Sequence, residues 1–160
     1  MSNLLPSRPR HVGQRRTVAI VSGQYNGELV KGLTDHALRE LGAISGNIQT
    51  LHFEVPGAFE IPLAVQRVAG RKDIDAVIAL GVIIEGETEH ASLIATSVTD
   101  ALQQIALAND IPVIHEVLLV KSVEQARQRC IEDEINRGTE AARVAIRMTQ
   151  VLQEIGATKR

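Results

Sequence analysis

The stretch Asp75-Ala76-Val77-Ile78-Ala79-Leu80-Gly81-Val82-Ile83-Ile84 decides the fold class, because it is the most apolar run of the 160-residue chain. A strand that is apolar on both faces is suited to the centre of a parallel sheet with helices on both sides. We therefore expect a buried central strand over residues 75–84.

Strand and helix patterns alternate on both sides of this run. Apolar spacing predicts further strands over residues 17–21, 48–55 and 112–120. It predicts helices over residues 29–41, 59–69, 89 or 90 to 108, 123–130 and 139–155. Gly42 and Gly156 are expected to end the first and last helix. With right-handed crossovers, this order predicts an α/β fold: a three-layer αβα sandwich around a four-stranded parallel sheet.

The chain divides into an N-terminal arm, residues 1–16, and a single α/β domain, residues 17–160. The arm holds four arginines, two prolines and no acidic residue. One interpretation is a solvated, partly disordered terminus. The other is an arm that adds a strand to the sheet edge of a neighbouring subunit.

Composition argues against several functional classes. A formal net charge of -2 gives no basic surface for a phosphate backbone, so nucleic acid is not an expected partner. No apolar stretch approaches the roughly 20 residues needed to cross a bilayer. Cys130 is the only cysteine, and the first residues lack the apolar core of a signal peptide. These features predict a cytoplasmic protein without membrane contact.

Ligands of such sheets bind beyond the carboxyl ends of the strands, which selects four segments as candidate sites. These are residues 22–27, 56–60 and 84–90, and residue 120 onward with the helix after it. In the first segment, Tyr25 could stack on a planar ring or simply cap a helix end. In the second, Glu60 and Phe59 follow a Pro-Gly turn. Glu60 either contacts a ligand or only stabilises the helix dipole.

The segment over residues 84–90 opens a helix directly after the central strand. Backbone N–H groups there, with the Thr88 hydroxyl, would form an anion cradle. His90 lies in the first helical turn and could move protons near neutral pH, or it could be an ordinary surface histidine. Metal binding by Glu85, Glu87, Glu89 and His90 is a further alternative, but one histidine among acids is a weak metal signature.

The fourth strand and the helix after it carry unusual polar residues. Arg127 and Arg129 could hold a phosphate, although arginines on a short exposed helix are most often solvated. The polar pair His115-Glu116 interrupts a strand that should be apolar, which indicates a functional or interface surface.

Taken in order, several strings resemble the lumazine synthase family. They are Val55-Pro-Gly-Ala-Phe-Glu-Ile-Pro62, Ala79-Leu-Gly-Val-Ile-Ile84 with Gly86-x-Thr88-x-His90, Ile111-Pro-Val-Ile114, Glu124-Gln-Ala126 with Arg129, and Asn136-Arg-Gly-x-Glu-Ala-Ala142. The similarity covers nearly everything after Thr17. It implies a flavodoxin-like fold and an enzyme of riboflavin biosynthesis that needs no cofactor and no metal.

The reaction implied is a condensation of 5-amino-6-(D-ribitylamino)uracil with 3,4-dihydroxy-2-butanone 4-phosphate. The products are 6,7-dimethyl-8-ribityllumazine, phosphate and water. By the resemblance, His90 exchanges protons with the substrates. The residues implied in ribitylaminouracil binding are Tyr25, Ala58, Phe59, Glu60, Val82, Ile83, Ile84 and His115. Those implied in butanone phosphate binding are Glu87, Thr88 and Arg129.

The resemblance also implies a homo-oligomer, a pentamer or a 60-mer of pentamers, in which His115 and Arg129 reach the pocket from the adjacent subunit. Riboflavin synthase is a further possible partner. The chain departs from the family pattern at Glu85, at His115-Glu116 and in the acidic stretch Ile131-Glu-Asp-Glu-Ile135. Because these changes lower the positive charge near the expected phosphate, a catalytically weak shell protein that binds flavin or lumazine is the alternative function.

Overall fold

A computed structural model describes residues 5–10, 13–86 and 88–157 of the chain. Within these residues, four parallel strands form one sheet in the order β2-β1-β3-β4. The strands are β1 (Arg16–Gly23), β2 (Ile48–Val55), β3 (Ala76–Ile84) and β4 (Val113–Val120). The expected four-stranded parallel sheet is therefore confirmed, with the apolar run over residues 76–84 in an interior position.

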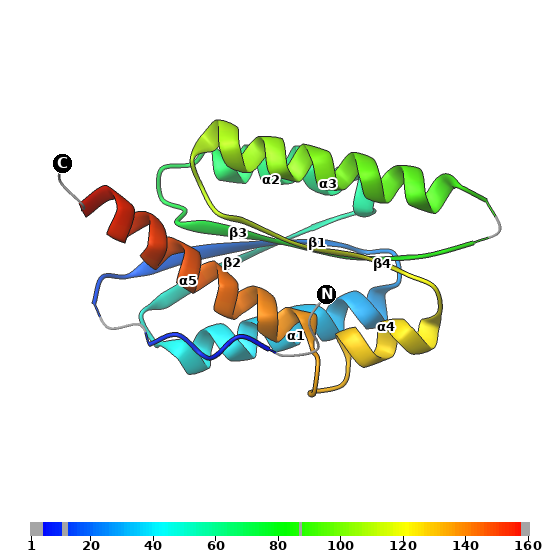
Figure 1. Ribbon diagram of the computed structural model, residues 1–160, viewed down its shortest axis with the longest axis horizontal. Helices are drawn as coiled ribbons and strands as arrows, with labels where there is room; N and C mark the ends of the chain where they lie inside the picture. Colours follow the sequence, from blue (N-terminus) through cyan, green and yellow to red (C-terminus); the bar gives the residue numbers. More distant parts are fainter. Residues whose placement is uncertain (1–4, 11–12, 87, 158–160) are drawn as a thin grey trace.

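Helices cover both faces of this sheet (Figure 1). The short 3₁₀ turn η1 (Ala58–Glu60) leads into α2, which packs with α3 on one face, while α1, α4 and α5 cover the other. The α-helices are α1 (Gly27–Ile44), α2 (Ile61–Ala69), α3 (His90–Asn109), α4 (Val123–Cys130) and α5 (Arg137–Ala157). The expected three-layer αβα sandwich of the flavodoxin-like type is thus confirmed.

Two aliphatic cores lie on opposite faces of the sheet, as the alternation of side chains along each strand requires. On β3, Ile78 and Leu80 join the core beneath α1, α4 and α5, whereas Val77 and Ala79 join the core beneath α2 and α3. All four side chains are fully buried. The strand is buried from both sides, which explains its continuous apolar sequence.

Neither glycine that was expected to end a helix does so, and those two predictions are wrong. Helix α1 passes Gly42 and continues to Ile44, and α5 passes Gly156 and continues to Ala157. Glycine costs only about 1 kcal/mol in a helix interior relative to alanine. Because Ile44 packs against the core beneath α1, the extra turn buries apolar surface that offsets this cost.

Residues 5–10 of the N-terminal arm lie against α1 and α5. Arg8 forms a two-point ion pair with the buried carboxylate of Glu40, at 2.7 and 2.9 Å. Arg143 donates to the same carboxylate at 2.8 Å and to the carbonyl of Pro6 at 2.7 Å. The two arginines hold the pKa of Glu40 low, at about 2. Residues 5–10 thus contact the chain's own helices, while the addition of a strand to a neighbour's sheet stays a prediction.

Candidate active site

A cavity of about 590 Å³ opens at the carboxyl ends of β1 and β3. The chain leaves β1 toward β2 on one side and leaves β3 toward β4 on the other, so the strand order reverses between these two central strands. Ligands of open α/β sheets bind at this topological switch point. The cavity is lined by Tyr25, Asn26, Gly57, Ala58, Phe59, Glu60, Val82, Ile83, Ile84, Gly86, Thr88, His90, Ala91 and Ile94.

The aromatic wall of the cavity depends on Gly57. A methyl group at Gly57 would lie 2.8 Å from Cδ2 of Tyr25 and 3.0 Å from Oε2 of Glu60. The Tyr25 ring and the Glu60 carboxylate therefore both rest against the Gly57 backbone. Tyr25 is 72% exposed and Phe59 is 61% exposed, so both rings are open to a ligand.

The turn before α2 places Glu60 at the start of a helix. Pro62 is the second residue of α2, where its missing N–H removes no helical hydrogen bond. Glu60 is the residue directly before α2, and its side chain makes no capping hydrogen bond there. Its carboxylate is thus left available to the cavity.

Helix α3 begins at His90, close to the end of the most buried strand. Its N-cap residue, Glu89, makes no side-chain capping hydrogen bond, so the first backbone N–H groups of α3 lack a side-chain acceptor. Thr88 and His90 are both exposed and both line the cavity. None of the described residues hydrogen-bonds the His90 ring, which leaves its two nitrogens available for proton exchange with a ligand. Glu87, expected to contact phosphate through its main chain, lies outside the described residues.

The cavity thus brings together nine of the side chains or backbone segments singled out from the sequence. These are Tyr25, Ala58, Phe59, Glu60, Val82, Ile83, Ile84, Thr88 and His90. His115 and Arg129 are not among the residues that line it. No lysine or arginine is among the described residues that line the cavity.

His115 faces helix α3 from strand β4. Its Nδ1 accepts a hydrogen bond from the N–H of Val117 at 3.1 Å, so its Nε2 carries the proton. Nε2 lies 2.7 Å from Oγ1 of Thr99, which donates in turn to the carbonyl of Ala95. Partial burial lowers the pKa of His115. The imidazole is therefore a neutral, oriented group on an edge strand.

Arg129 lies on α4, half-buried, with one weak contact of 3.5 Å from Nη1 to the carbonyl of Gln125. Its neighbour Arg127 instead pairs with Glu28 of α1 at 3.3 Å. In the acidic stretch that follows, Asp133 lies 3.3 Å from Arg39 of α1. Arg129 therefore keeps most of its donors available, and one of the three acids near it is already paired within the chain.

Glu116 is the second polar residue of β4 and points toward the α5 layer. Burial, together with the nearby Glu140, raises the pKa of this carboxyl to about 8, although Arg137 opposes both effects. Arg137 is itself buried and forms an ion pair with Glu140. The unusual His115-Glu116 pair thus splits across the sheet, with one side chain toward α3 and the other toward α5.

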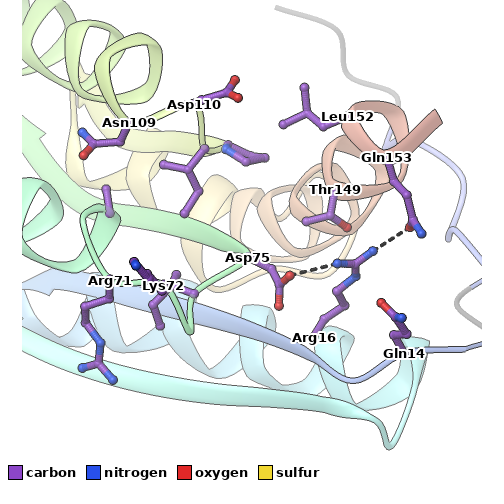
Figure 2. A pocket seen from close by; sticks show the side chains of 14 residues that line it. Gln14, Arg16, Arg71, Lys72, Asp75, Asn109, Asp110, Thr149, Leu152 and Gln153 are labelled. Carbon is purple, nitrogen blue, oxygen red and sulfur yellow. Dashed lines mark hydrogen bonds and ion pairs between the residues drawn. The ribbon is translucent and has the colours of Figure 1, made fainter. Parts of the chain in front are cut away.

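A second cavity, of about 480 Å³, lies at the opposite end of the sheet (Figure 2). There the Arg16 guanidinium lies between Asp75, at 2.9 Å, and Gln153, at 2.6 Å. Asp75 also accepts the backbone N–H of Thr17 at 2.7 Å. Arg71 is paired with Asp73 at 2.7 and 3.0 Å. The contacts of Arg16 thus hold the start of β1 to α5 and to Asp75, the residue before β3.

Five residues that line the cavity were not singled out as site residues: Asn26, Gly57, Gly86, Ala91 and Ile94. Asn26 and Gly57 carried signals that could have found them. Gly57 was assigned only to the turn, although a glycine beside an aromatic and an acid can also mark a close approach. Asn26 carried a weak signal, since asparagine before a helix usually caps it. In this chain the Asn26 side chain makes no capping hydrogen bond and donates instead to the carbonyl of Val82 at 2.8 Å.

The described residues contain neither a cluster of metal-ligating side chains nor a membrane-spanning helix. No group of three or more histidine, cysteine, aspartate or glutamate side chains there is placed to hold a metal ion. Within the same residues, every helix is too short or too polar to span a bilayer.

Comparison with known proteins shows which family the chain belongs to. A sequence model of the family described as 6,7-dimethyl-8-ribityllumazine synthase matches residues 15–153. The chain belongs to the 6,7-dimethyl-8-ribityllumazine synthase family. Several enzymes named 6,7-dimethyl-8-ribityllumazine synthase are similar to this chain over most of its length and most of their own. That of Methylibium petroleiphilum is 37% identical over 145 residues, which cover 90% of this chain and 88% of the relative.

Lumazine synthases from two further organisms give the same result. That of Halorhodospira halophila is 39% identical over 142 residues, covering 87% of this chain and 90% of the relative. That of Thermus thermophilus is 37% identical over 139 residues, covering 86% and 88%. The match spans every strand and the whole cavity, so the family resemblance seen in the sequence is confirmed.

Proposed function

We propose that this chain condenses 5-amino-6-(D-ribitylamino)uracil with 3,4-dihydroxy-2-butanone 4-phosphate to give 6,7-dimethyl-8-ribityllumazine, phosphate and water. This is the penultimate step of riboflavin biosynthesis, and the cytoplasm is the expected location. The observation that carries the proposal is the cavity at the switch point, where an aromatic ring, a carboxylate, a hydroxyl and an imidazole face one space of about 590 Å³.

The proposed roles follow from chemistry. Tyr25 stacks on the pyrimidine ring, and Glu60 with Ala58 and Phe59 binds the ribityl chain. The backbone of residues 82–84 contacts the uracil. The substrate amine attacks the ketone to form an imine with loss of water, and phosphate leaves by elimination. The ribityl-bearing nitrogen then attacks the newly formed carbonyl, and loss of a second water closes the ring. Holding the two reactants together supplies much of the rate.

Proton transfer and phosphate binding fall to the start of α3. His90 accepts and returns protons, since it lines the cavity and its ring has no hydrogen-bond partner among the described residues. Thr88, with the main chain at Glu87 and the uncapped N–H groups of α3, holds the phosphate. The reaction requires no cofactor or metal in this scheme.

The lack of a lysine or arginine among the described lining residues supports a site shared between subunits. Because Arg129 and His115 do not line the cavity of their own chain, we propose that both complete the cavity of an adjacent copy. The chain would then act as a homo-oligomer, a pentamer or a 60-mer of pentamers, and riboflavin synthase is a possible further partner. Arg129 would balance the phosphate, and the neutral His115 would cover the pyrimidine.

The direct test is to mix the purified chain with both substrates and follow lumazine absorbance and fluorescence. We expect formation well above the uncatalysed background. Formation at the background rate, with lumazine still bound, would instead identify a binding shell without catalysis.

The shared site can be tested separately with two variants. His90→Ala and Arg129→Ala should each lower activity when alone. If each site uses His90 of one chain and Arg129 of its neighbour, dissociating and reassembling an equal mixture should restore about one quarter of the wild-type sites. No recovery, with light scattering showing mixed oligomers, would contradict a site built from two chains.

A further inference from the structure

Asn26 has a backbone conformation that most residues avoid. It is left-handed, with φ 57° and ψ 42°, and it shares this property with only Asp110 among the described non-glycine residues. Asparagine adopts this region more readily than most residues. Its carbonyl accepts the N–H groups of Leu29 and Val30 at 2.9 and 3.1 Å, so the backbone of Asn26 starts helix α1.

The side chain of Asn26 bridges two strands that have already separated. The pairing of β1 with β3 ends at Ser22 and Leu80, two residues before Val82. Beyond that point β3 has no strand on its β1 side. The Asn26 amide takes the place of the missing strand by donating to the carbonyl of Val82 at 2.8 Å.

This hydrogen bond fixes which way the end of β3 faces. Backbone groups of successive strand residues point to alternate edges of the strand. The N–H of Glu85 donates to the carbonyl of Val120 in β4 at 2.8 Å, so the backbone N–H and C=O of Glu85 point toward β4. The backbone groups of Val82 and Ile84 then point toward the β1 side, where Tyr25 and Asn26 border the cavity. The Val82 carbonyl already accepts the Asn26 amide. The backbone N–H and C=O of Ile84 are therefore the pair that a ligand in the cavity could bind.

We propose that Asn26 is a positioning residue that holds the end of β3 for recognition of a cyclic imide edge. A cyclic imide presents an acceptor and a donor side by side, which complements the adjacent N–H and C=O of Ile84. Asn26 does not contact the substrate in this scheme. The inference rests on the proposed function, because the pyrimidine substrate is the ligand that carries such an edge.

Two variants separate the amide from the backbone. Asn26→Gly keeps the left-handed conformation and removes the donor. Asn26→Asp keeps the size and shape but turns an acceptor toward the Val82 carbonyl. Asp110→Gly is the matched control, because Asp110 has the same conformation (φ 51°) at the far end of α3 and lies outside this cavity.

The measurements are kcat and both KM values for wild type and variants, together with binding of 6,7-dimethyl-8-ribityllumazine by fluorescence. For Asn26→Gly we expect about a tenfold rise in the KM for the pyrimidine and in the lumazine Kd, the loss of about one hydrogen bond. The KM for butanone phosphate and kcat should stay within about twofold, and Asn26→Asp should bind still more weakly. Asp110→Gly should match wild type.

Three results would overturn the inference, and each is distinct. If the wild type is active and both Asn26 variants keep its pyrimidine KM and lumazine Kd, Asn26 plays no part in recognising the pyrimidine. An equal rise in both KM values would show that Asn26 only supports the fold. Absence of lumazine formation by the wild type itself would reject the proposed function, and the inference would fall with it.

Discussion

The two ends of the sheet carry cavities of similar size, but their polar side chains differ in whether they are already paired within the chain. At the carboxyl end, Glu60 and His90 face the cavity without a hydrogen bond from the described residues, and helices begin there. At the amino end, Arg16, Asp75 and Arg71 are held in ion pairs within the chain. The volume of a cavity therefore does not distinguish a site from a structural joint. The state of its polar groups does.

The physical reason lies in the direction of the elements. Helices that follow parallel strands point their N-termini, with free N–H groups, to the carboxyl end of the sheet. Their C-termini, with free carbonyls, meet at the amino end, where cationic side chains such as Arg16 are stabilised. One end is thus prepared for anionic ligands, whereas the other is neutralised internally.

The largest expected effect comes from removing the proton-exchanging group. We expect His90→Ala to lower kcat by about 100-fold, within the usual range for general acid–base catalysis. Lumazine binding and oligomer mass should be nearly unchanged, as measured by fluorescence and light scattering. The control is Arg71→Ala at the other cavity, which should leave kcat within about twofold. Equal losses of kcat in both variants would show that the two cavities do not differ in their importance for catalysis.

Glu116 is an exception to the comparison, since its partly buried carboxyl lies at neither end of the sheet. Its pKa is about 8 in the folded chain, above the ordinary value of 4.5. The folded state therefore holds the proton more tightly, and stability falls as pH rises from 4.5 toward 8. Glu116→Gln should raise the free energy of unfolding by about 2–3 kcal/mol at pH 7.5 and by little at pH 4.5.

Urea unfolding at fixed protein concentration checks this at both pH values. The conservative control Glu124→Gln changes an exposed carboxyl in the first turn of α4. An equal gain at pH 4.5 and pH 7.5 would mean that charge at Glu116 does not limit stability.

A smaller effect is expected from filling the space beneath the aromatic wall. Gly57 has an extended backbone, with φ −147°, so alanine fits its conformation and only its methyl group is new. Gly57→Ala should displace Tyr25 and Glu60 and weaken lumazine binding about tenfold, or about 1.4 kcal/mol. Gly42→Ala, at a helical glycine with open space around it, should leave binding unchanged. Wild-type affinity in Gly57→Ala would show that the ring position does not matter.

The smallest effect on activity is expected at the amino-end cavity. Asp75→Asn removes the charge that pairs with Arg16 but keeps an acceptor for the Thr17 N–H. We expect the free energy of unfolding to fall by about 1 kcal/mol, while kcat/KM stays within about twofold. Chemical denaturation and steady-state assays measure the two quantities. A large loss of kcat/KM without a loss of stability would make this cavity functional as well.

Sequence patterns predicted the parts of the molecule that depend on periodicity and topology. The strand over residues 48–55 and the helix over 123–130 were predicted with their observed bounds. The position of the cavity followed from the rule that ligands bind at strand carboxyl ends. Helix ends at Gly42 and Gly156 were missed, because the cost of a glycine is small and packing decides where a helix stops.

Contacts between distant residues were beyond the sequence patterns. The hydrogen bond from Asn26 to Val82 joins residues 56 positions apart, and the Glu40 carboxylate is reached from Arg8 and Arg143. The direction of His115 toward Thr99 depends on how α3 crosses β4. Such contacts follow from the packed geometry, not from spacing along the chain.

The ion pairs at Glu40 also have a practical consequence. Because this carboxyl has a pKa of about 2, it stays ionised down to strongly acidic solution, and its contribution is lost only as pH falls from about 4.5 toward 2. The segment that begins at Pro6 is therefore tethered beside α5 at ordinary pH. None of the residues of α1, α4 or α5 lines the carboxyl-end cavity. A label or fused peptide placed ahead of Pro6 would thus be attached on the layer of α1, α4 and α5 and not beside the cavity of its own chain.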